Sequence, residues 1–172
     1  MKKIVLFFLP IFCFAKNLAL ENRFNPPARE LMDVEIIGDI MIIPGNLDGY
    51  DFYDISNPIN PTLITNFEVP MGNRSLPGLW VSAVDSVAYF TCRTRQAGSA
   101  IVNFSDPSNP DHLGSLSVSG TNINNPSFEG SDIYGDILAV AAHEDGVLSV
   151  SYTHLRAHET LRYLVCRLLL EK

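Results

Sequence analysis

Between residues 36 and 149 the hydrophobic positions fall in short runs that are separated by glycine, proline, asparagine or aspartate. Ile40–Ile43 is one such run, and its length is typical of a strand buried on both faces. Asn46–Gly49 predicts a hairpin turn, because glycine accepts the positive φ that such turns need. Tyr50–Ile55, rich in aromatic and β-branched residues, predicts the return strand. Helical periodicity is weak throughout this region, which predicts an all-β fold.

The same phrase occurs twice along the chain. Residues 54–61 read Asp-Ile-Ser-Asn-Pro-Ile-Asn-Pro, and residues 103–110 read Asn-Phe-Ser-Asp-Pro-Ser-Asn-Pro, 49 positions later. A glycine opens the next strand in each unit, at Gly49, Gly98 and Gly146. Three or four short strands in roughly 40–50 residues, repeated in tandem, indicate propeller blades. We therefore expect an incomplete β-propeller of about two and a half four-stranded blades over residues 36–149, because propellers close with about four to eight blades.

The repeated phrase resembles a known family. Residues 50–61 are similar to the LVIVD repeat, whose hallmark is a strand ending in Asp-Val/Ile-Ser-Asn/Asp-Pro followed by a second proline. The second unit, residues 100–110, has Asn103 in place of the aspartate, and the third unit stops at Ser149 before its hallmark. The resemblance implies a β-propeller in a longer secreted or surface protein of bacteria or archaea. It carries over no shared catalytic residues.

Both ends of the chain differ from this region. Residues 1–15 have two lysines, an apolar run and the small residues Cys13 and Ala15, the layout of a secretory signal peptide. Residues 16–35 form a lead-in segment.

Residues 150–172 have the pattern of an amphipathic helix, but they resemble a translated transposon-end sequencing adapter. Leu164–Lys172, for example, can be encoded by CTC GTA TGC CGT CTT CTG CTT GAA AAA. We therefore expect His154 and His158, one helical turn apart, to carry no inherited chemistry.

Charge and cysteine content exclude several classes of protein. The chain has a formal net charge of -7, and residues 16–149 carry 17 acidic and 6 basic side chains, a net charge of -11. This acidic balance argues against a nucleic-acid binder. Cys92 is the single cysteine of residues 16–149, and its strand context predicts a buried small side chain rather than a reactive thiol.

Candidate sites are few. Asp48, Asp51 and Asp54 near the first hairpin, with Glu144 and Asp145 in the third unit, could supply oxygens to calcium, but their spacing fits no calcium loop and favours solvated turn residues. His112 and His143 have no second ligand at zinc spacing. Trp80 could form a ligand-stacking patch, although a core or blade-edge position is the simpler interpretation.

The sequence thus predicts no catalytic residue, no cofactor and no metal. We expect an exported propeller that acts as an interaction or structural module, with an unknown protein or glycan ligand at the surface and no membrane span after signal cleavage. The long connections that contain the polar stretches 72–75 and 120–127 are candidates for the rim of a binding face. The alternative is an exported hydrolase or lyase, which would need carboxylates or histidines converging from several blades.

Overall fold

The computed structural model describes residues 22–27, 30–71, 74–93, 99–116 and 127–151, which form three antiparallel sheets of three or four strands and one two-stranded sheet. The first sheet has the order β1 (Glu35–Ile37), β2 (Ile40–Pro44), β3 (Tyr50–Asp54), β4 (Thr62–Phe67). The second has β7 (Trp80–Val84), β8 (Val87–Thr91), β9 (Ser99–Asn103), β10 (Asp111–Gly114). The third has β11 (Ser131–Tyr134), β12 (Ile137–Ala141), β13 (Val147–Ser151). The all-β prediction is confirmed.

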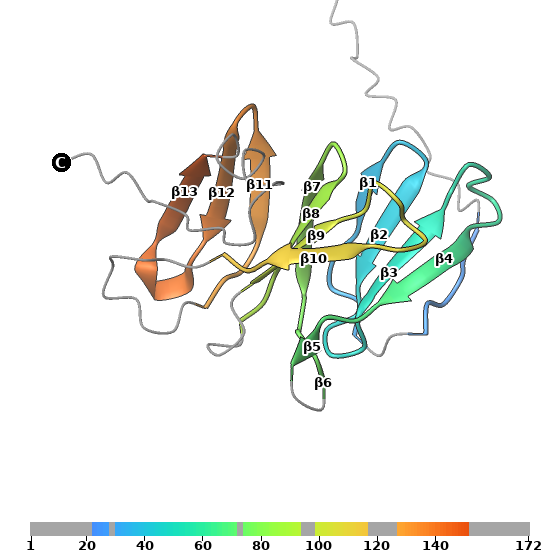
Figure 1. Cartoon of the computed structure of the whole chain (residues 1–172), viewed down its shortest axis with the longest axis horizontal. Helices are drawn as coiled ribbons and strands as arrows, with labels where there is room; N and C mark the ends of the chain where they lie inside the picture. Colours follow the sequence, from blue (N-terminus) through green and yellow to red (C-terminus); the bar gives the residue numbers. More distant parts are fainter. Residues whose placement is uncertain (1–21, 28–29, 72–73, 94–98, 117–126, 152–172) are drawn as a thin grey trace, which may run out of the picture.

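The sheets stand side by side in chain order, with the second between the other two (Figure 1). We call the face of a sheet that points toward the next sheet along the chain its front face, and the opposite one its back face. The front of the first sheet and the back of the second share one core, whose buried members are Ile42, Tyr50, Phe52, Val69, Leu76, Val81, Ala88, Phe90, Ala100, Val102 and Phe104. The front of the second and the back of the third share another, formed by Val87, Tyr89, Ile101, Leu116, Phe128, Leu138, Val140 and Ala142. Side chains along β8 therefore alternate between two cores, because successive strand residues point to opposite faces.

The two similar phrases have the same hydrogen bonds. The backbone N–H of Ser56 donates to Asp54 Oδ1 at 2.8 Å, and that of Ser105 donates to Asn103 Oδ1 at 2.9 Å. One turn later, the N–H groups of Asn60 and Asn109 each donate to the carbonyl three residues earlier, both at 3.0 Å. Asp and Asn side chains that bond two residues ahead stabilise such turns. The Asp-to-Asn exchange at position 103 thus preserves the turn.

The loops between the second and third strands also match between the first and third sheets. The N–H of Gly45 donates to the Gly49 carbonyl at 2.9 Å, and the N–H of Ala142 donates to the Gly146 carbonyl at 2.7 Å. Gly49 and Gly146 have φ values of 84° and 83°. The positive φ expected at Gly49 is therefore present, and the same backbone conformation recurs 97 residues later.

Close contacts between sheets involve the first strands. β7 contacts β1 and β2 on one side and β11 on the other. Across the second boundary, the hydroxyl oxygens of Ser82 and Ser131 lie 2.8 Å apart. β1, β7 and β11, which are edge strands of the three sheets, therefore lie together.

Some details differ from the sequence-based expectations. β4 ends at Phe67, and Pro70–Met71 forms a separate short strand, β5, paired with β6 (Arg74–Ser75), which the sequence did not predict. Proline is tolerated there because a two-residue hairpin needs few ladder bonds. Val150 and Ser151, which were assigned to the tail, pair with β12 as the end of β13. The expected signal peptide and the rest of the expected C-terminal helix lie outside the described residues.

Candidate functional site

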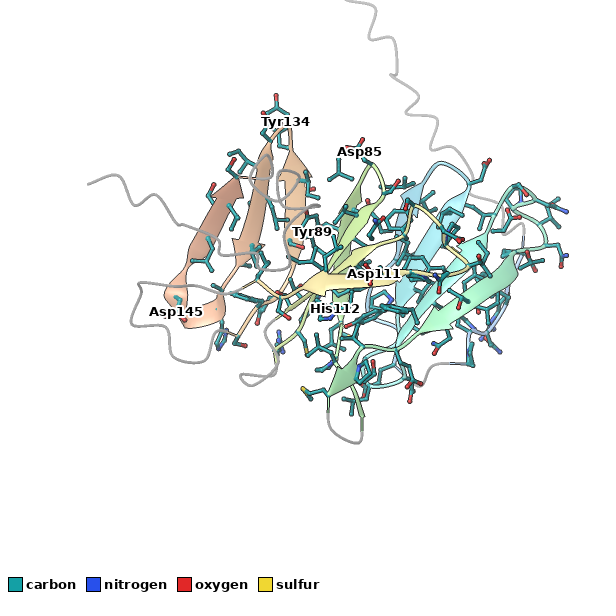
Figure 2. All side chains as sticks on the ribbon, viewed as in Figure 1. Asp85, Tyr89, Asp111, His112, Tyr134 and Asp145 are labelled. Atoms are coloured by element: carbon teal, nitrogen blue, oxygen red, sulfur yellow. The ribbon has the colours of Figure 1, made fainter. Side chains whose placement is uncertain are left out.

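The chain places different connections at the two ends of the sheets. The turns between first and second strands, at Gly38, Asp85 and Gly135, lie at one end, and the loops between second and third strands lie at the other. Asp85 and Tyr134 mark the first end in Figure 2, and Asp145 marks the second. Because each sheet is antiparallel, the connections from one sheet to the next also start at this second end. We call it the loop end.

A charged cluster lies at the loop end between the second and third sheets. The carboxylate of Glu129, which precedes β11, lies 3.0 Å from Arg93 Nε and 3.5 Å from His143 Nδ1 through the same oxygen, Oε1. The guanidinium carbon of Arg93 is 5.5 Å from the centroid of the Trp80 ring. We call these four residues the Glu129 cluster. Arg93 and His143 are 65% and 53% exposed, so an approaching molecule can reach both.

The cluster draws on a position that all three sheets share. Asn46, Arg93 and His143 each lie two residues after the end of the second strand of their sheet. Asn46 Nδ2 donates to Glu30 Oε2 at 2.7 Å, so a glutamate is the partner at this position in the first sheet as well. Glu30 and residues 45–48 line a shallow pocket there. The loop end therefore presents polar side chains from equivalent positions in neighbouring sheets.

A second group of carboxylates lies where the first strands meet. Asp33 Oδ2 accepts a hydrogen bond from the backbone N–H of Val81 at 3.0 Å, and the Glu35 carboxylate accepts one from the backbone of Ala83. Burial raises the pKa of Glu35, and the nearby carboxylates of Asp33 and Asp132 raise it further, against the lowering effect of the Ala83 bond. Val81 and Ala83 belong to β7, the edge strand of the second sheet. The two carboxylates therefore satisfy edge amides that would otherwise be open to pairing.

The acidic residues proposed for the first hairpin do not act as one group. Asp51 was expected to be a solvated turn residue, but it is 1% exposed and its Oδ1 accepts from Asn66 Nδ2 at 2.7 Å. The expectation was wrong because Asp51 lies inside β3, on its back face, rather than in the turn. Hydrogen bonds from Ser56 lower the pKa of Asp54, which serves its own turn. Within the described ranges, no three His, Cys, Asp or Glu side chains are grouped so that they could hold a metal ion.

The remaining single residues are placed as follows. Cys92 is buried, as predicted from its context, and is not part of a disulfide. His112 lies on β10, the outer strand of the second sheet (Figure 2). Trp80 is half-buried at the start of β7, an edge strand of the second sheet, and the Arg93 guanidinium lies over its ring.

Glu129 and Arg93 were missed at the sequence level. They lie 36 positions apart, and neither belongs to a repeated phrase. The sequence did contain one signal for this site. Asn46, Arg93 and His143 each follow the second strand of their unit by the same number of residues. The convergence of Asp33 and Glu35 on β7 was likewise not visible, since it depends on how two sheets pack.

Comparisons with known proteins found no match: no family model, no curated protein and no solved structure is similar to this chain at a significant level. Among the described residues, no helix is long and apolar enough to cross a membrane.

Proposed function

We propose that this chain is part of an exported β-propeller of the LVIVD-repeat type and that it acts as an interaction module whose binding surface is the loop end. The Glu129 cluster is the observation that carries the proposal. It joins side chains from the second and third sheets around one carboxylate, with exposed hydrogen-bond donors and an aromatic ring. Binding sites commonly combine an apolar surface with a few converging polar groups.

The packing of the sheets supports the propeller part of the proposal. The first and second sheets bury their front faces against the back face of the sheet that follows, and the first strands lie together at β7. A propeller arranges its blades around an axis in this manner. The export part rests on the pattern of residues 1–15.

A binding role is better supported than the hydrolase alternative. A hydrolase at the meeting point of the first strands would use Asp33 and Glu35, which already accept hydrogen bonds from β7. By contrast, the side chains of Arg93 and His143 are exposed. The ligand class that fits them is a glycan or peptide that carries acidic and hydrogen-bonding groups.

A binding screen of the purified full chain on glycan and peptide arrays tests the proposal. The expected result is a ligand whose binding falls at least about tenfold in Arg93→Ala, because a few anchor residues carry most of the affinity. His112→Ala is the matched control, since it removes another exposed polar side chain of the second sheet, on the outer strand β10. A ligand that binds both variants as it binds the unchanged chain would place the surface elsewhere and contradict the proposal.

A further inference from the structure

The backbone around Asn46 in the first sheet matches the backbone around His143 in the third. Both residues have positive φ values, 54° and 50°, in loops that are closed by equivalent hydrogen bonds to the carbonyls of Gly49 and Gly146. Asparagine and histidine are among the non-glycine residues that adopt this conformation most readily. The same backbone geometry therefore presents both side chains at the loop end.

Both side chains also contact a glutamate from the segment that precedes the first strand of their sheet. Asn46 Nδ2 donates to Glu30 Oε2 at 2.7 Å, and His143 Nδ1 lies 3.5 Å from Glu129 Oε1. Glu30 is exposed and Asn46 is half-buried, so a ligand can reach both from solvent. The Asn46–Glu30 pair is therefore the first-sheet counterpart of the Glu129 cluster.

Each of these contacts brings a nitrogen donor beside a carboxylate acceptor. A sugar hydroxyl both donates and accepts hydrogen bonds, so neighbouring hydroxyls of one ring can bond to both members of such a pair. A peptide would instead need an apolar pocket for an anchor side chain or an open strand edge. Among the described residues that line the pocket beside Glu30, only Leu47 has a large apolar side chain. The chemistry of the Asn46–Glu30 pair thus favours a glycan over a peptide.

The charge at this pocket limits the kind of glycan. The described residues that line it include the carboxylates of Glu30 and Asp48 and no basic side chain. These carboxylates repel an acidic group, whereas the exposed Arg93 guanidinium in the second sheet can bond either a hydroxyl or an acidic group. The sugar residues that the first sheet accepts are therefore uncharged.

We propose that the ligand of the loop end is an extended glycan that bonds the Asn46–Glu30 pair and the Glu129 cluster at the same time. This inference rests on the proposed function, because it names the ligand of the same surface. Packed sheets lie about 10 Å apart, so the ligand must extend over at least that distance to reach both places. A polymer of repeating units suits binding groups that recur from sheet to sheet, and joining two contacts in one ligand raises its affinity.

Glycan arrays probed with the full chain test the inference. The probes are neutral hexose oligosaccharides of several linkages, from disaccharides to octasaccharides, and a polyuronate series of the same lengths. In at least one neutral series, the longer members should bind at least about tenfold more tightly than the disaccharide. Asn46→Gly should abolish this gain, since it removes the side chain while glycine keeps the positive φ. Asp85→Gly is the matched control, because Asp85 has the same φ of 54° in a turn at the opposite end of the sheets, and its variant should retain the gain.

Glu30→Ala is a second variant at the same place and should also abolish the gain, and circular dichroism checks that all variants fold. Glycan binding that does not increase with length, or a gain that survives both substitutions, would overturn the inference while the proposed binding role of the loop end stands. A gain confined to the polyuronates, or binding of peptides without any glycan, would overturn it as well. If Arg93→Ala also leaves all binding unchanged, the proposed function itself fails.

Discussion

Asn66 Nδ2 donates to Asp51 Oδ1 at 2.7 Å across the β3–β4 pair, and the other oxygen of Asp51 has no hydrogen-bond partner among the described residues. The corresponding back-face residues of the other two sheets are apolar, Ala100 in β9 and Leu148 in β13. Burial raises the pKa of Asp51, and the neighbouring Asp48 carboxylate adds to this effect, while the Asn66 bond opposes it. Asp51 is therefore an ionisable group in a place that favours a neutral side chain.

Asp51→Asn should stabilise the protein at neutral pH. The raised pKa means that the folded state holds a proton more tightly than the unfolded state. Stability from this group is therefore fully present below the ordinary pKa of aspartate and is lost as the pH rises through the raised value. We expect Asp51→Asn to increase the free energy of unfolding at pH 7 by about 1 kcal/mol, the lower end of the cost of an unpaired buried polar group. Urea unfolding at pH 4 and pH 7 measures this, and an advantage of the variant that shrinks toward pH 7 would contradict it.

Gly78→Ala should destabilise the contact between the first and second sheets. Gly78 is paired with Asn46 in an isolated bridge, and a Cβ at position 78 would lie 2.7 Å from Tyr50 Cε1 and 3.2 Å from Phe90 Cβ. Tyr50 cannot move freely, because its ring stacks on Phe90 with centroids 3.7 Å apart and its hydroxyl donates to the Leu76 carbonyl. Overpacking of this kind costs about 1–3 kcal/mol.

Thermal unfolding measures the effect of Gly78→Ala. Gly130→Ala is a suitable control, because it introduces the same side chain into another connection where a Cβ would meet no atom within 4 Å. Equal melting temperatures for the two variants would show that the close approach at Gly78 is unimportant.

Asp33→Ala should weaken the edge of the second sheet. The substitution removes the acceptor of the Val81 N–H, and an amide left without a partner in a half-buried place costs about 1–3 kcal/mol. Asp33→Asn keeps an oxygen acceptor and should lose much less stability. Hydrogen exchange at the Val81 amide distinguishes Asp33→Ala from Asp33→Asn. If this amide exchanges equally fast in both variants, the negative charge of Asp33, and not its oxygen acceptor, protects the amide.

Asn103→Asp should be nearly neutral, and Asn103→Ala should be destabilising. Asn103 Oδ1 accepts from the Ser105 N–H as Asp54 Oδ1 accepts from that of Ser56, so an aspartate at position 103 keeps the bond. Alanine removes it, at a net cost of about 0.5–1.5 kcal/mol. Chemical denaturation of the two variants compares them, and a loss as large in Asp as in Ala would show that the two turns are not equivalent.

Local features of the chain were determined by its sequence. Gly49 predicted its own positive φ, and the Ser-Asn/Asp-Pro phrases predicted two turns that have the same hydrogen bonds, because these depend on residues at most a few positions apart. The buried strand β2 was predicted by its apolar run for the same reason.

The tertiary structure alone decided which residues meet across sheets. Glu129 reaches Arg93 and His143, and Asp33 reaches Val81, only because three separate sheets pack face to face. The burial of Asp51 was decided in the same way, since it depends on what covers the back face of the first sheet. Contacts of this kind depend on packing between segments far apart in the chain, and spacing along a single sequence does not specify that packing.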